Sequence, residues 1–170
     1  FYDKITTKSI HETIIKSAAD LISAATPDYQ YLAARLAIFH LRKIAYGQFE
    51  PPHLFDHVTK LTRESRYDTH ILQDYSRAEF DELNAYIDHC RDLDFAYAAV
   101  KQMEGKYLVQ DRVTKQVFES PQFLYMLVGM CLFAGYDKHK RLDYIKRFYD
   151  ATSNFYISLP TPIMSGVRTP

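Results

Sequence analysis

The sequence predicts a mainly α-helical protein, and three observations lead to this expectation. Apolar residues recur at helical spacing through most of the chain, and a Ser-x-x-Glu capping box, as at Ser76 and Glu79, opens some of these stripes. Runs that favour β-structure are few. With 47% apolar and 25% charged residues, the 170-residue chain has a globular composition and is long enough for one substantial helical core.

The beginning of the chain is expected to form a helical hairpin. Ser9 and Glu12 have the spacing of a capping box, so the first helix should begin at Ser9. Asp28 should cap a second helix. Gly47 should end that helix, because glycine readily takes the left-handed conformation found at helix C-termini.

Two successive prolines, Pro51 and Pro52, mark the boundary to a second helical unit, since they end one element and pre-set the first turn of another. A later helix of this unit should end at Gly105. Beyond it, Tyr107–Val109 and Val117–Phe118 favour β-structure on either side of a polar segment, which predicts one small hairpin.

The last stretch of the chain changes character. Tyr156–Leu159 favours an extended conformation, and Pro160 and Pro162 then flank a single threonine. The two prolines should fix an extended backbone and hold the Thr161 side chain in a defined direction. Rigid loops of this kind often carry function.

Charge and cysteine content exclude several classes of protein. Lys plus Arg equals Asp plus Glu at 21 each, so the chain has no electrostatic footprint for nucleic acid. No apolar run approaches the length that spans a membrane, and the first residues lack the apolar core of a signal peptide. Cys90 and Cys131 form no CxxC pair, so we expect reduced, buried thiols in a cytoplasmic protein.

Two clusters of polar residues suggest metal or acid–base chemistry only weakly. His53 and His57 lie four apart on one helical face, but Asp56 is too short for the glutamate role in an inverted zinc motif, and no third ligand is evident. We therefore expect surface histidines and no metal site. Asp92 and Asp94 are expected to be helix caps and solvated loop residues.

A third cluster could bind a phosphate or a ribose. His40 and Lys43 lie three apart near the end of the second helix, His11 lies one turn into the first, and Thr7 adds a hydroxyl. These residue types supply a point charge and hydrogen-bond donors to an anion, although, taken alone, they are better explained by solvent contact or helix capping. The chain has no P-loop and no GxGxxG motif. Local chemistry alone thus defines no enzyme class.

Longer stretches resemble a known family over essentially the whole chain. Ser158–Pro170 closely resembles the segment of class I ribonucleotide reductase large subunits that leads into their ten-stranded catalytic barrel. Asp28–Leu36, continuing through His40–Lys43, is similar to the last helix of the family's regulatory ATP-cone. Phe95–Tyr97, Lys106–Leu108 and Arg147–Asp150 are similar to its helical N-terminal domain.

The resemblance implies an activity for the parent protein. Such enzymes reduce ribonucleoside diphosphates to deoxyribonucleotides by thiyl-radical chemistry, under allosteric control by ATP and dATP. The implied partners are a radical-generating small (β) subunit with a metal centre, a second large subunit, and thioredoxin or glutaredoxin as reductant. Thr161 matches a residue that contacts the substrate phosphate, whereas Cys90 and Cys131 match no catalytic position. We therefore expect no catalytic residue here, and the first cysteine of the reducing pair shortly after Pro170.

The regulatory site carries over in part. Thr7, His11, His40 and Lys43 fall where the family contacts ATP or dATP. The glycine-containing hairpin that lids this site in the family would precede Phe1, so we expect weak or no binding of ATP, and no cofactor bound by this chain.

The resulting expectation has three parts. Residues 1–49 form two helices of a partial ATP-cone, residues 50–154 form a helical domain with a hairpin near 106–119, and residues 155–170 begin the catalytic barrel and the substrate loop, with its first strand. The isolated chain should be inactive. The alternative is a self-contained helical protein-interaction module, which the neutral charge and aromatic content also allow.

Overall fold

A computed structural model describes residues 3–170, and in this part of the chain the protein is almost entirely helical, which confirms the expected class. The α-helices are α1 (Thr7–Asp20), α2 (Tyr29–Tyr46), α3 (Leu54–Arg63), α4 (His70–Asp74), α5 (Arg77–Tyr86), α6 (Tyr97–Gln102), α7 (Pro121–Phe133), α8 (Arg141–Ser153) and α9 (Thr161–Gly166). A 3-10 turn, η1 (His89–Asp94), precedes α6, and a π turn, η2 (Met103–Tyr107), extends it.

Helix α7 is the centre of the fold. Every residue from Pro121 to Met130 is buried, as the nearly all-apolar sequence of this helix requires. Its N-terminus follows the preferred order, with Ser120 at the N-cap and Pro121 at the first helical position. Helices α8 and α9 and the turn η1 all contact α7.

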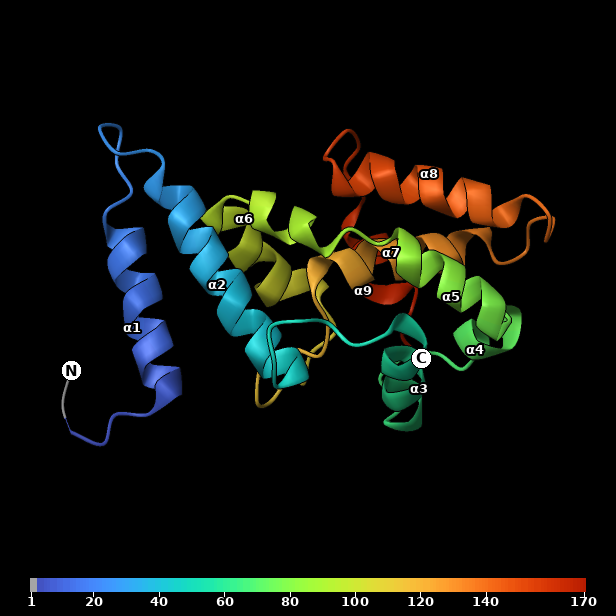
Figure 1. Ribbon diagram of the computed structural model, residues 1–170, viewed down its shortest axis with the longest axis horizontal. Helices are drawn as coiled ribbons and strands as arrows, with labels where there is room; N and C mark the ends of the chain where they lie inside the picture. Colours follow the sequence, from blue (N-terminus) through green and yellow to red (C-terminus); the bar gives the residue numbers. More distant parts are fainter. Residues whose placement is uncertain (1–2) are drawn as a thin grey trace.

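Helices α1 and α2 form the expected hairpin at one end of the molecule (Figure 1). Gly47 ends α2 with a φ of 73°, as predicted. The predicted cap of α1 is wrong: Thr6 is the N-cap, and its side chain accepts a hydrogen bond from the Ser9 backbone N–H at 3.1 Å. Ser9 therefore lies inside the helix, and Glu12 is exposed and pairs with Lys8 instead of capping.

The expected hairpin is present in minimal form. Gln110 and Val117 make an isolated antiparallel bridge, flanked by backbone hydrogen bonds from the Phe118 N–H to the Val109 carbonyl at 2.9 Å and from the Asp111 N–H to the Gln116 carbonyl at 2.8 Å. Tyr107, expected in the first strand, lies in the π turn instead, and so does Gly105, which was expected to end a helix. The capping box of Ser76 and Glu79 at the start of α5 is confirmed.

The expected strand at Tyr156–Leu159 and the extended loop after it are wrong. No strand forms there, and Thr161–Gly166 is the helix α9. Pro160 is its N-cap and Pro162 lies in its first turn, where the proline φ suits a helix and a missing N–H costs nothing. Met164 closes the first turn by donating its N–H to the Pro160 carbonyl at 3.2 Å.

Across residues 3–170, no helix combines the length and the apolarity that crossing a bilayer requires.

Gly129 allows α7 and α8 to approach closely. A Cβ at this position would lie 3.0 Å from Cδ1 of Phe148 and 3.4 Å from Cγ2 of Ile145. We expect Gly129→Ala to lower the free energy of unfolding by about 1–3 kcal/mol, because overpacking outweighs the better helix propensity of alanine. Urea denaturation measures this, with Gly135→Ala as the control, since a Cβ at Gly135 meets nothing within 4 Å. Equal stability of the two variants would contradict the close packing.

Candidate functional site

The hairpin of α1 and α2 brings two of the four predicted effector residues together. The Nδ1 atoms of His11 and His40 lie 3.3 Å apart, with the rings at 82°. Thr7 lies one turn before His11 on α1 and is exposed. Lys43 lies one turn after His40 on α2 and is also exposed, with its Nζ 5.9 Å from the Phe39 ring centroid. The structure thus gives one contacting pair and two solvent-facing groups on the same two helices.

The surroundings of His40 favour its neutral form. Burial and then the neighbouring His11 lower the pKa of His40, and these effects outweigh the carboxylates of Glu12 and Glu104, which raise it. A neutral His40 can donate an Nδ1–H to Nδ1 of His11 or accept one from it, depending on its tautomer. Together with the exposed ammonium of Lys43, the cluster offers polar contacts to an anionic ligand without a closed pocket of its own.

The predicted substrate residue, Thr161, is the first residue of α9 and is exposed. Its carbonyl oxygen accepts a hydrogen bond from Oγ of Ser165 at 2.8 Å, which closes the helix behind it. The threonine side chain is therefore available to a ligand, and its direction depends on how α9 is held.

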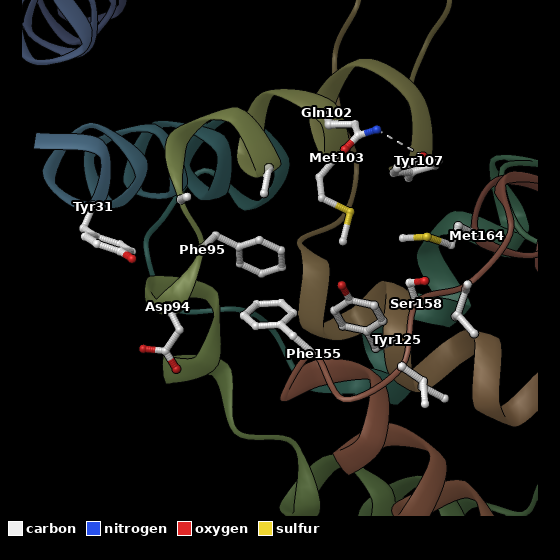
Figure 2. A pocket seen from close by; sticks show the side chains of 14 residues that line it. Tyr31, Asp94, Phe95, Gln102, Met103, Tyr107, Tyr125, Phe155, Ser158 and Met164 are labelled. Atoms are coloured by element: carbon white, nitrogen blue, oxygen red, sulfur yellow. Dashed lines mark hydrogen bonds between the residues drawn. The ribbon is translucent and has the colours of Figure 1, made fainter. Parts of the chain in front are cut away.

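A mostly apolar cavity of about 640 Å³ adjoins α9 on its inner side (Figure 2). Met164 from α9, Tyr125 from α7, and the rings of Phe95 and Phe155 line it, the two rings edge to face with centroids 4.9 Å apart. Burial raises the pKa of Tyr125, so its hydroxyl stays protonated. Asp94 supplies the one carboxylate among the residues that line the cavity, and it is exposed. The cavity therefore has no acid–base pair.

The two histidines of α3 do not share a surface, so the expectation for His57 is wrong. His53 is the N-cap of α3, and its Nε2 lies 3.2 Å from the Asp81 carboxylate. His57 is 4% exposed, stacks on Phe123 with centroids 4.7 Å apart, and lies 3.1 Å from the hydroxyl of Tyr67. In residues 3–170, no group of three or more His, Cys, Asp or Glu side chains could hold a metal ion.

Beyond Tyr67 lies a buried charge that the sequence did not reveal. Oε2 of Glu119 accepts a hydrogen bond from the Tyr67 hydroxyl at 2.5 Å, and Oε1 accepts one from the Val109 N–H at 2.8 Å. Both oxygens also accept from the guanidinium of Arg168. Burial disfavours the ionised carboxylate, but Arg168 and these donors outweigh burial and hold the pKa of Glu119 below its ordinary value.

A second buried charge overturns the expectation that Asp92 is solvated. Asp92 has no exposed surface, and Oδ2 accepts a hydrogen bond from Nη2 of Arg42 at 2.7 Å. Oδ1 accepts one from the Gln122 N–H at 3.2 Å. Asp94 is exposed, as expected. The pair joins α2 to η1 and to the start of α7.

The cysteines differ from each other. Cys90 is exposed, contrary to the expected burial, and Cys131 is partly buried. Burial raises the pKa of the Cys131 thiol to about 12, so it is protonated at neutral pH and is a poor nucleophile.

The second half of this helical chain matches a known class of protein. Residues 93–170 match the family described as "Ribonucleotide reductase, all-alpha domain". The whole chain is 68% identical to the ribonucleoside-diphosphate reductase 1 subunit alpha of Escherichia coli strain K12 and 68% identical to the corresponding subunit alpha of Haemophilus influenzae. Over 168 residues it is 46% identical to the subunit alpha of Enterobacteria phage T4.

The chain belongs to the ribonucleotide reductase large-subunit family, as its sequence motifs indicated. It spans 22% of the length of each of these relatives. Because the matches run through the whole chain, they favour this family over a self-contained interaction module.

The buried His57 should make stability depend on pH. Burial lowers its pKa from 6.5 to about 4, with Glu119 opposing and Lys60 and His89 assisting. As the pH falls from about 7 to about 5, the unfolded state binds a proton that the folded state excludes, so His57 should reduce stability by about 2 kcal/mol. We expect His57→Gln to have a shallower loss of stability over this range in urea denaturation.

The matched control is His139→Gln, because the His139 side chain is exposed to solvent. It should keep the slope of the unmodified chain. Equal slopes for the two variants would show that His57 takes up its proton in the folded state.

Proposed function

We propose that the chain forms part of the alpha subunit of a ribonucleoside-diphosphate reductase, an oxidoreductase that makes deoxyribonucleotides for DNA synthesis from ribonucleoside diphosphates. The observation that carries this proposal is the 68% identity to named alpha subunits over all 170 residues. An identity this high over the whole chain supports a shared fold for the matched segment. The chemistry of reduction would then reside in the other parts of the subunit.

In this proposal the chain has three functional parts. Residues 1–49 are two helices of a regulatory ATP-cone, residues 50–154 are the helical domain, and residues 155–170 lead toward the catalytic barrel. The α1–α2 hairpin at one end of the molecule supports the first boundary, and α2 also packs on α6 and η1 of the second part. The last part carries α9 in place of a strand.

The proposed effector contacts are Thr7, His11, His40 and Lys43. Their support is the 3.3 Å contact of the two histidines and the position of the other two residues one turn away on the same helices. ATP and dATP are the proposed effectors of the parent. With Thr7 and Lys43 open to solvent, the chain alone should bind them weakly.

The proposed substrate contact is Thr161, toward a phosphate of the ribonucleoside diphosphate. Its exposed position at the start of α9 supports this role. We propose no catalytic residue in this chain, because neither cysteine matches a catalytic position. The proposed partners in the cytoplasm are a radical-generating β subunit, a second alpha subunit and thioredoxin or glutaredoxin.

Thr161→Val tests the substrate role in the full-length subunit. Loss of the hydroxyl should raise KM for the ribonucleoside diphosphate by about tenfold, because a hydrogen bond to a charged phosphate is removed. Steady-state reduction assays measure this. Thr69→Val is the control, since Thr69 is exposed and makes no side-chain cap bond. Equal KM values for the two variants would contradict the assignment of Thr161.

A further inference from the structure

Helix α9 is too short to hold itself in place. Its six residues make little more than one turn, and isolated helices of this length are unstable in water. All six residues are described, and of these Met164 alone is buried. The direction of Thr161, at the beginning of this helix, must therefore be set by contacts made elsewhere.

Besides the packing of α9 on α7 and η2, Arg168 supplies polar contacts just beyond the end of the helix. Its Nη1 donates to the Met164 carbonyl at 2.5 Å, and its Nη2 donates to the Tyr107 carbonyl at 2.8 Å. Its own carbonyl accepts the N–H of Asp68 at 2.9 Å. The arginine thus connects the last turn of α9 to η2 and to the segment after α3.

The guanidinium is in turn fixed by Glu119. Nε of Arg168 lies 3.1 and 3.0 Å from the two carboxylate oxygens, and Nη2 donates to Oε1. Both side chains are 0% exposed. Tyr67 and the Val109 N–H complete the shell of the carboxylate, so neither charge can move without leaving a donor or acceptor unpaired.

Stability alone does not account for such a pair. Apolar residues of similar volume are often at least as stabilising as a buried ion pair, since desolvation offsets the attraction. A planar guanidinium bound by both carboxylate oxygens offers a fixed orientation instead. Other buried arginines, Arg42 and Arg141, lie in α2 and α8, which are longer than α9 and bury several residues of their own. Because α9 buries only Met164, its packing on α7 and η2 gives it limited support, and the ion pair adds a fixed orientation.

We propose that Glu119 and Arg168 are positioning residues for substrate binding: they fix α9, and through it the direction of the Thr161 hydroxyl. This inference rests on the proposed role of Thr161 in binding a substrate phosphate. Neither residue touches the substrate, and both act through the backbone of α9.

Glu119→Gln in the full-length subunit tests this role. The amide keeps the shape but removes the charge, so α9 should lose its fixed position and KM for the ribonucleoside diphosphate should rise by about tenfold, with kcat changed by less than about twofold. Arg168→Lys keeps the positive charge but loses the planar guanidinium that donates to both carboxylate oxygens, and it should raise KM to a smaller extent. If Glu119→Gln fails to fold, Arg168→Lys tests the same positioning role.

Asp92→Asn is the matched control, because it removes the charge that pairs with the buried guanidinium of Arg42 but does not touch α9. It should destabilise the protein and leave KM unchanged. If Asp92→Asn raised KM as much as Glu119→Gln does, general destabilisation would explain both variants and the positioning role would be overturned.

Hydrogen exchange separates this proposal from the role of Thr161. Glu119→Gln should speed exchange of the α9 amides, whereas Thr161→Val should not. A normal KM for Glu119→Gln beside a raised KM for Thr161→Val would overturn the positioning role alone. A normal KM for Thr161→Val would remove the proposed substrate contact, and unchanged α9 exchange in Glu119→Gln would show independently that the ion pair does not hold the helix.

Discussion

The carboxylate of Glu119, which has no exposed surface, is the point at which separate parts of the chain meet. Glu119 lies just before the central helix α7. Its carboxylate accepts hydrogen bonds from Tyr67, from the Val109 backbone and from Arg168 near the end of the chain. The hairpin, the segment after α3 and the helix α9 all converge on it. Because an unpaired carboxylate is costly to bury, these segments must be in place together or not at all.

Two other arginine–carboxylate pairs repeat this arrangement around the same core. Arg42 and Asp92, 50 residues apart, attach the α1–α2 hairpin to the start of α7. Arg141 and Glu79, 62 residues apart, attach α8 to α5. Apolar packing on α7 supplies the bulk of the core, and the ion pairs specify how the peripheral helices are oriented on it. The proposed effector and substrate residues lie on the elements that these pairs attach.

The sequence predicts what depends on neighbouring residues and misses what depends on distant ones. Helix α7, the hairpin of α1 and α2 and the capping box at Ser76 follow from local spacing, and all are observed. Asp92, Glu119 and His57 look like ordinary polar residues until partners in distant parts of the chain bury them. The sequence gives one indication of the role of Glu119, because this residue is an isolated charge shortly before the apolar run of α7.

The C-terminal segment and the candidate site show the same limit. A proline on each side of Thr161 is compatible with an extended loop and with the first turn of a helix, and the contacts of Arg168 decide for the helix. Family motifs identified Thr161, His11 and His40 as candidate site residues, and the structure adds that the histidines touch. The residues that orient α9 have no such motif and are visible only in the fold.

A double-mutant cycle on Glu119→Leu and Arg168→Met, followed by urea denaturation, tests the central claim most directly. Each single variant should lose about 3–5 kcal/mol of unfolding free energy, because it leaves one buried charge without its partner. The double variant should lose far less than the sum of the two, since no charge is then left unpaired. Additive losses would show that the two side chains act independently and that no ion pair organises this end of the protein.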